Sequence, residues 1–236
     1  MRSPDPSEPE IDDRRTGGGA IQRHAGLADE VYEAILAQLM ALKIPPGARI
    51  TVDNLVRELK VSHTPIREAL GRLEGEGLVV KAHLIGYSAA PQISRSHFDD
   101  LYEMRLLLEP DSARRAAKTM NEDRLAELHK LAGAMTNRSG EDARLRYSAF
   151  ARQDAVFHDR ILEFAGNELI RQALAHQHTH FHIFRLMFHS RVTEEALEEH
   201  EALLDAFARN DAAGAEAAMR DHIMRSRSRL LPAFDI

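Results

Sequence analysis

The chain of 236 residues is long enough for two modest domains, and its 44% hydrophobic and 29% charged residues are typical of a soluble globular protein. It contains no cysteine, which excludes disulfides and thiolate metal sites, so any metal must be bound by histidine and carboxylate side chains. The formal net charge of −6 does not by itself suggest a nucleic-acid-binding protein.

Residues 1–22 are rich in proline, glycine and charge and lack the apolar segment of a signal peptide, so we expect a disordered tail there. No apolar run elsewhere approaches the length of a membrane helix. We therefore expect no membrane partner and a cytoplasmic location.

Residues 23–91 are predicted to form a winged helix-turn-helix domain. Apolar residues recur at helical spacing from Leu27 until Pro45-Pro46-Gly47 ends the first helix. A second helix is expected after Thr51, and a third from His63 to about Glu74. Two β-prone pieces, around 78–80 and 86–88, then form a hairpin. Three short helices followed by a hairpin are typical of this DNA-binding fold.

Residues 92–236 are predicted to form an all-α bundle. A long helix is expected from Ser94 or Ser96 onward, and Pro110 should kink it rather than end it. Further helices are expected at roughly 121–135, 142–165, 168–188, 193–209 and 211–230. The predicted fold class is thus mainly α, with a winged helix-turn-helix followed by a helical bundle.

The third helix of the first domain has one apolar and one polar face. The polar face carries His63, Thr64 and Arg67, with Arg72 farther along. Hydroxyls at a helix N-terminus suit phosphate contacts, and arginine suits guanine in the major groove. An ordinary solvent-exposed face of an amphipathic helix explains the same pattern equally well. The pattern alone therefore leaves both interpretations open.

A resemblance favours DNA binding. Residues 61–70 (VSHTPIREAL), the segments 72–74 and 76–79, the upstream residues 45–50 (PPGARI) and Gly86 together resemble the signature of GntR-family transcription regulators. The resemblance implies a homodimer that binds double-stranded operator DNA, with the wing in the minor groove. The predicted DNA-binding residues are Ser62, His63, Thr64, Arg67, Arg72 and Gly86.

Two residues depart from the family pattern. The family usually has arginine at the position of His63, and another near the start of the second helix, where this chain has Asp53. Both changes remove positive charge from the expected interface, which weakens the phosphate contribution to binding. We therefore expect an operator that differs from the family's commonest one.

The second domain contains a candidate metal site. Asp154 and His158 are one helical turn apart and share a face. His200 and His222 lie on successive predicted helices, and the break at Asn210-Asp211 falls almost midway between them, so a hairpin there brings both to one level. One carboxylate and three imidazoles can bind a divalent cation. Taken singly, such pairs are more often surface pairs or core histidines.

The second domain also resembles a known one. Residues 100–105 (DLYEMR) with Glu109, residues 154–158 (DAVFH), Glu199-His200 and His222 resemble the all-helical (FCD) ligand-binding domain of the FadR-type branch of GntR regulators. The resemblance implies zinc, nickel or a similar ion on Asp154, His158, His200 and His222. It also implies a small carboxylate effector beside the metal, anchored by Arg105, although Arg105 could equally pair with Glu109 at i+4.

Four histidines, His176, His178, His180 and His182, lie in one predicted helix, where they would form two faces. A pocket-lining or solvated role is more plausible for them than metal binding. Arg185 on the same helix is a candidate second anion contact.

We therefore expect an effector-responsive transcription regulator and not an enzyme. A metal-dependent enzyme of the helical-bundle type is one alternative, but no separate general base or nucleophile pattern stands out. The other alternative is a sensor of the metal ion itself.

Overall fold

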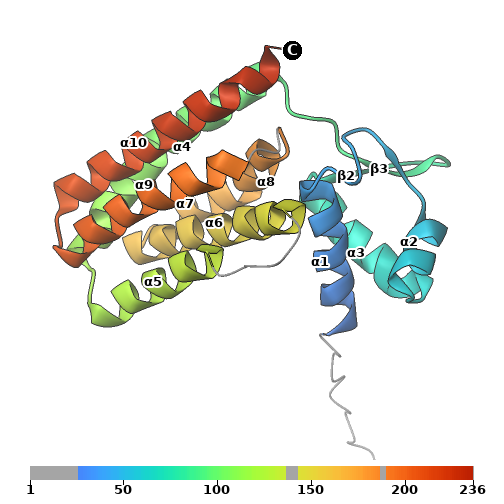
Figure 1. The fold of residues 1–236 in the computed structure, drawn as a ribbon, viewed down its shortest axis with the longest axis horizontal. Helices are drawn as coiled ribbons and strands as arrows, with labels where there is room; N and C mark the ends of the chain where they lie inside the picture. The colour runs from blue at the N-terminus through green and yellow to red at the C-terminus, as the bar shows by residue number, and fades with distance from the viewer. Residues whose placement is uncertain (1–25, 137–142, 187–189, 236) are drawn as a thin grey trace, which may run out of the picture.

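The computed structural model describes residues 26–136, 143–186 and 190–235, so the tail expected at residues 1–22 lies outside the described part. The predicted fold class is confirmed, because a winged helix-turn-helix precedes an all-helical bundle (Figure 1). Among the described residues, no helix is both long and apolar enough to cross a membrane.

The N-terminal unit contains three helices and a small sheet. The helices are α1 (Leu27–Met40), α2 (Val52–Leu59) and α3 (His63–Gly75), and the strands are β1 (Arg49–Ile50), β2 (Val79–Ala82) and β3 (Gly86–Ala89). Strand β3 lies in the middle and pairs antiparallel with both neighbours. The sequence did not predict β1, a strand of two residues that is too short for any alternation of apolar and polar positions to be detected.

The core of this unit follows the predicted apolar stripe of α3. Ile66, Ala69, Leu70 and Leu73 are fully buried, and Ile35 and Leu39 of α1 are equally buried. Helix α1 packs along α3, so the two helices that meet at this core are held together by apolar burial.

The C-terminal unit consists of helices α4 to α10. Their bounds are α4 (Arg95–Lys118), α5 (Glu122–Thr136), α6 (Ala143–Ala165), α7 (Glu168–His176), α8 (Thr179–Phe184), α9 (Ser190–Ala208) and α10 (Ala212–Leu230), with a 3₁₀ turn at Leu231–Phe234. Ser94 caps α4, because its side chain accepts a hydrogen bond from the His97 amide. Pro110 lies within α4 and does not end it, as predicted.

The single helix predicted at 168–188 is wrong. The chain forms α7 and α8 instead, separated at His178, whose φ of 43° lies in the left-handed region. A left-handed residue cannot continue a right-handed helix, so α8 starts in a new direction. The four histidines therefore do not form two faces of one helix, and residues 187–188 lie outside the described part.

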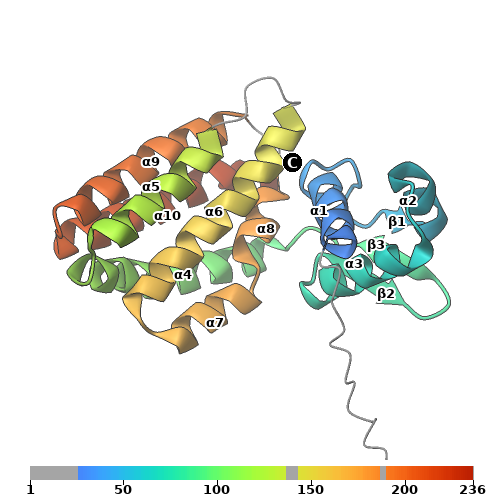
Figure 2. The same cartoon turned by 90° about the horizontal axis from the view of Figure 1, so that it is seen from below.

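The two units contact each other through α1 and α6. In Figures 1 and 2, α1 lies between the bundle and the rest of the N-terminal unit, against the first turns of α6. Glu33 of α1 forms an ion pair with Arg152 of α6. The linker is also fixed to the end of α8, because the Gln92 amide donates to the carbonyls of Arg185 and Leu186, both at 3.1 Å.

Candidate metal centre and DNA-reading face

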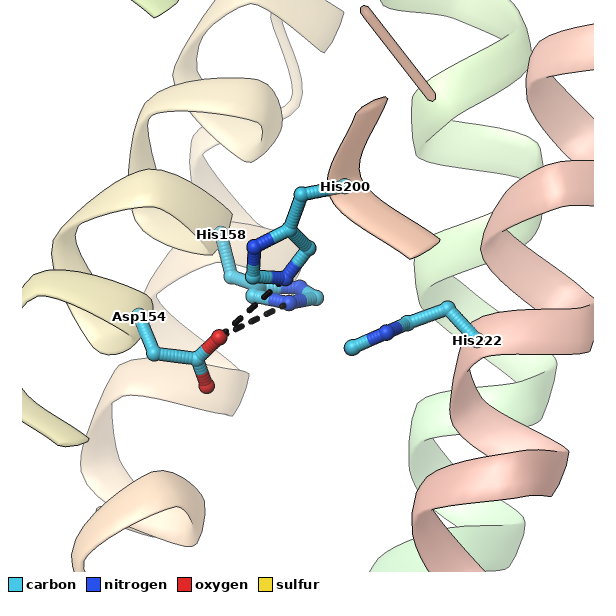
Figure 3. Close-up of side chains that lie close together, drawn as sticks. All are labelled: Asp154, His158, His200 and His222. Carbon is cyan, nitrogen blue, oxygen red and sulfur yellow. Dashed lines mark ion pairs between the residues drawn. The ribbon is translucent and has the colours of Figure 1, made fainter. Parts of the chain in front are cut away.

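Four predicted ligands meet inside the bundle. Asp154 and His158 project from α6, His200 from α9 and His222 from α10 (Figure 3). All four are buried, and one ligand atom from each lies within 4.8 Å of the others. The hairpin between α9 and α10 thus brings two histidines that are distant in sequence to the pair on α6.

Several polar atoms at this point lack hydrogen-bond partners. Oδ1 of Asp154, Nε2 of His158 and Nε2 of His200 are buried and unpartnered. Oδ1 of Asp154 lies 3.2 Å from Nε2 of His200 and 3.9 Å from Nε2 of His158. Each unsatisfied buried polar group costs about 1–3 kcal/mol, so this cluster is costly when empty. A cation that accepts these lone pairs would remove the cost, and three imidazoles with one carboxylate suit zinc or nickel.

Neighbouring acids orient two of the histidines. Nδ1 of His158 donates to Glu109 at 2.7 Å, and Nδ1 of His222 donates to Glu199 at 2.9 Å. These hydrogen bonds leave Nε2 of each ring for a metal, which is how metal-binding histidines are usually held. Sequence spacing could not reveal the role of Glu109, because it acts on a residue 49 positions away.

His180 supports the fourth ligand. Its Nδ1 lies 2.7 Å from Oδ2 of Asp154, which leaves Oδ1 for a metal. Burial alone would raise the pKa of Asp154, but the hydrogen bond from His180 and the surrounding imidazoles hold that pKa well below its usual range. One of the four clustered histidines therefore belongs to the centre, by orienting its carboxylate.

Two of the ligand histidines, His158 and His222, are neutral near pH 7. Burial lowers the pKa of His158 to about 3 and that of His222 to about 4. A neutral imidazole keeps a lone pair for a metal, so no proton has to leave these rings before an ion binds.

Arg105, the predicted effector anchor, is paired with Glu109. Its Nε lies 2.6 Å from Oε1 of Glu109, and the side chain is 1% exposed. Burial favours the neutral acid, but Arg105 and His158 together hold the pKa of Glu109 well below its usual range. The structure thus shows the i+4 pair that the spacing allowed as the alternative. An effector would reach this guanidinium only by opening the pair.

A cavity of about 580 Å³ adjoins the centre. Its described lining comes from α1, α4, α6, α7 and α8, and includes His158, Glu109 and His180 at the metal centre. Arg152 and Arg171 line it as well, whereas Arg105 and Arg185 are not among its lining residues. Neither cavity arginine was predicted from the sequence, because on α6 and α7 both resemble ordinary surface cations of amphipathic helices.

The remaining predicted residues of the segment 176–185 have different surroundings. Arg185 is buried and donates to the carbonyl of Ala90 at 2.7 Å, and it does not line the cavity beside the metal centre, so its role as an anion contact stays a prediction. His182 lies near Gly77, since a Cβ added at Gly77 would lie 3.8 Å from Nε2 of His182. His176 contacts the carbonyl of Gln172 in its own helix, and His178 lines the cavity.

The predicted DNA-reading residues lie at the exposed start of α3. Ser62 is the N-cap residue, and the side chains of His63, Thr64 and Arg67 are exposed. Nε2 of His63 lies 2.8 Å from Oδ1 of Asp53, so the two residues that depart from the family pattern contact each other.

Arg72 and the wing have different surroundings. Arg72 contacts α1, with Asp29 at 2.6 Å and the ring of Tyr32 at 4.1 Å, so its predicted DNA contact would compete with these partners.

In the wing, Gly86 starts β3 with φ of 98°, which favours glycine. Leu84 and Ile85 at the wing tip are 94% and 65% exposed. They were not predicted from the sequence as DNA contacts. Apolar side chains of this kind can wedge into a minor groove.

Comparisons with known families agree with this architecture. Residues 27–87 match the family described as "Bacterial regulatory proteins, gntR family", and residues 100–225 match the "FCD domain". The chain belongs to the GntR family of bacterial transcription regulators, and within it to the members that carry an FCD domain.

Similar proteins are regulators as well. The chain is 34% identical over 123 residues to the Nta operon transcriptional regulator of Aminobacter aminovorans, covering 52% of this chain and 56% of that protein. It is 30% identical over 114 residues to McbR of Escherichia coli, covering 48% and 51%. These two alignments thus span only about half of each relative. With LutR of Bacillus subtilis it shares 28% identity over 203 residues, covering 77% and 90%.

Solved structures show the same fold. The structure of E. coli McbR/YncC matches with a TM-score of 0.66 at 20% identity, covering 87% of this chain and 97% of that one. A putative GntR regulator from Rhodococcus sp. RHA1 matches with a TM-score of 0.65 at 19% identity, covering 86% and 97%. The role rests on the two family matches: the chain is a DNA-binding transcription regulator with an FCD effector domain, and not an enzyme.

Proposed function

We propose that a small carboxylate bound beside a divalent metal ion controls operator binding by this regulator. The observation that carries the proposal is the convergence of three buried, unpartnered ligand atoms, on Asp154, His158 and His200, with His222 beside them. A bound zinc or nickel ion would supply positive charge and open coordination positions for the effector's carboxylate.

The residues around the site have distinct tasks in this proposal. Glu109 and Glu199 fix the rings of His158 and His222, and His180 fixes the carboxylate of Asp154. The cavity of about 580 Å³ gives a small acid room beside His158. These contacts hold the site in one geometry, so an effector finds it already formed.

The operator contacts belong to the N-terminal unit. Ser62, His63, Thr64 and Arg67 are assigned to the major groove and the adjacent phosphates, and the wing with Gly86 to the minor groove. A homodimer would present two such helices to two half-sites related by two-fold symmetry. We place the boundary between the DNA-binding domain and the effector domain near Pro91, within the linker from β3 to α4.

Sensing of the metal itself is the second candidate function. Four protein ligands can complete a tetrahedral zinc site with no organic ligand, and all four are buried here. In that case the metal alone would change operator affinity.

Operator titrations distinguish the two functions. A duplex selected from random DNA is titrated with metal-free and zinc-loaded full-length protein, with and without a panel of carboxylic acids. The proposal predicts that an acid changes the operator Kd about tenfold or more, and only in the zinc-loaded protein. A change caused by zinc alone supports the metal sensor, and no change with either rejects both functions.

A further inference from the structure

The cavity beside the metal centre is shared by both units. Tyr32, Glu33 and Leu36 of α1 line one side of it. The other lining residues come from the bundle and include His158 at the metal centre. A molecule in this cavity would therefore touch the DNA-binding unit and the metal centre together.

The lining combines apolar walls with two arginines and with three acids that are each paired with an arginine, Glu33, Glu109 and Asp159. The apolar side chains are Leu36, Ala155, Val156, Leu162, Leu174, Ala175 and Phe181. Arg171 is held by acids of its own unit, with two contacts of 2.9 and 3.0 Å to Asp159 and two of 2.9 and 3.1 Å to Glu168. Arg152 differs, because it pairs with Glu33 of the other unit.

Arg152 has spare hydrogen-bonding capacity. Its Nε is buried and has no hydrogen-bond partner. A carboxylate can accept from Nε and a terminal nitrogen of one guanidinium at once, which makes a stronger contact than a single hydrogen bond. Glu33 contacts the terminal nitrogen Nη1, whereas Nε shares its edge of the guanidinium with the other terminal nitrogen. An acid bound on that edge would compete with Glu33 for the positive charge and repel its carboxylate.

The spacing of the two anion-binding points sets the ligand class. Arg152 and His158 both lie on α6, six residues apart, which corresponds to about 9 Å along the helix axis. The wall between them includes Ala155 and Val156. A ligand that spans them needs an acidic group at each end of an apolar body.

We propose that the effector is an elongated acid with two anionic groups, one at the metal centre and one on Arg152. The second group repels Glu33 and so weakens the ion pair between α1 and α6. This inference rests on the proposed function, since it uses the same metal-associated site.

Repulsion of Glu33 would reach the DNA-reading helix through α1. The neighbouring Tyr32 donates from its hydroxyl to Glu76 at the end of α3, at 2.7 Å, and Arg72 of α3 stacks on its ring. Helix α1 also packs along α3 through the apolar core. The two helices are therefore expected to move as one body, and weakening of the ion pair loosens one of the contacts that hold that body to the bundle.

The test uses suberate (octanedioate) as the long diacid, succinate as the short diacid and octanoate as the monoacid. Each is titrated by calorimetry into zinc-loaded full-length wild type, Glu33→Gln and Arg152→Gln. Suberate is expected to bind Glu33→Gln about tenfold more tightly than wild type, and Arg152→Gln about tenfold more weakly. Octanoate and succinate should bind all three proteins equally, because neither places a second carboxylate on Arg152.

Opposite signs for suberate alone are decisive, since a purely structural ion pair would give both variants the same loss and a general change in cavity charge would shift octanoate and succinate as well. Equal zinc content and far-ultraviolet circular dichroism control for folding. The inference is overturned if both variants shift suberate affinity in the same direction, if neither shifts it, or if suberate fails to bind Glu33→Gln.

Operator titrations of the same proteins separate this inference from the proposed function. If an acid changes operator affinity equally in wild type and in both variants, the proposed function stands and the role of Arg152 is overturned. If no acid of any kind changes operator affinity in the zinc-loaded wild type, the proposed function itself fails.

Discussion

The DNA-reading face and the metal centre differ in how strongly the fold constrains them. The side chains of His63 and Asp53 are 56% and 74% exposed, so water solvates them whether or not they pair. Asp154 and His200 are buried, and their ligand atoms have no such alternative. Exposed polar residues can therefore change with little effect on stability, whereas buried ones require a partner. For this reason the fold constrains the metal centre more strongly than the DNA-reading face.

The same difference decides what the sequence could predict. The apolar stripe of α3, the shared face of Asp154 and His158 and the common level of His200 and His222 follow from helical spacing and one hairpin. That the two pairs meet was a hypothesis favoured by the family resemblance. The break at His178 could not be predicted, since neither glycine nor proline marks it.

The cavity and its contacts are the second part that sequence reasoning missed. Its lining joins α1 to α6, and the pair of Glu33 with Arg152 depends on how the two units pack. Such contacts leave no periodic signal in either segment, because each residue alone resembles a surface charge of an amphipathic helix.

The largest expected effect is on the buried acid beside the metal centre. Glu109→Ala leaves the buried Arg105 without its partner and His158 without its acceptor. The free energy of unfolding should fall by about 3–5 kcal/mol, measured by urea denaturation of the metal-free protein. Glu163→Ala, which removes an exposed partner of Arg160, is the matched control and should cost less than about 1 kcal/mol. Equal losses in the two variants would contradict the contrast between buried and exposed pairs.

Arg67 should be the residue with the largest effect on the exposed face. Arg67→Ala is expected to weaken specific operator binding by about 1–3 kcal/mol, because an exposed arginine at this position has base contacts to lose. Fluorescence anisotropy with a labelled operator measures the loss. Metal content should stay the same, and Arg160→Ala on the bundle should leave operator affinity unchanged. If Arg67→Ala binds the operator as well as wild type, α3 does not read DNA through this residue.

His182 should make stability depend on pH. Burial, aided by Arg185 and His97, lowers its pKa from 6.5 to about 4. Above pH 6.5 the ring is neutral in the folded and the unfolded chain, so it has no effect there. As the pH falls from 6.5 toward 4, the unfolded chain takes up a proton that the folded chain excludes, and stability drops by about 1–2 kcal/mol.

A comparison with His182→Gln isolates this contribution. The difference in unfolding free energy between wild type and His182→Gln, both metal-free, is measured across this pH range. The unfolding free energy of the wild type should fall relative to that of His182→Gln as the pH falls from 6.5 toward 4. A difference that stays constant with pH would show that His182 titrates normally.

The contact between Asp53 and His63 should have the smallest effect. Asp53→Ala removes a negative charge from the operator face and frees His63. Operator affinity should rise by less than about 1 kcal/mol and become more sensitive to salt, while stability stays nearly the same. Anisotropy titrations at several salt concentrations measure both changes. A loss of affinity would mean that Asp53 positions His63 for binding rather than opposing the phosphates.

The most direct test of the central claim is metal analysis of the purified full-length protein and His200→Ala after incubation with zinc and removal of free ions. Wild type should retain about one ion per chain, as expected for a site with three histidines and one aspartate. His200→Ala, which deletes a buried and unpartnered ligand, should retain almost none. Wild type without metal, or His200→Ala with as much metal as wild type, would contradict the assignment of this centre.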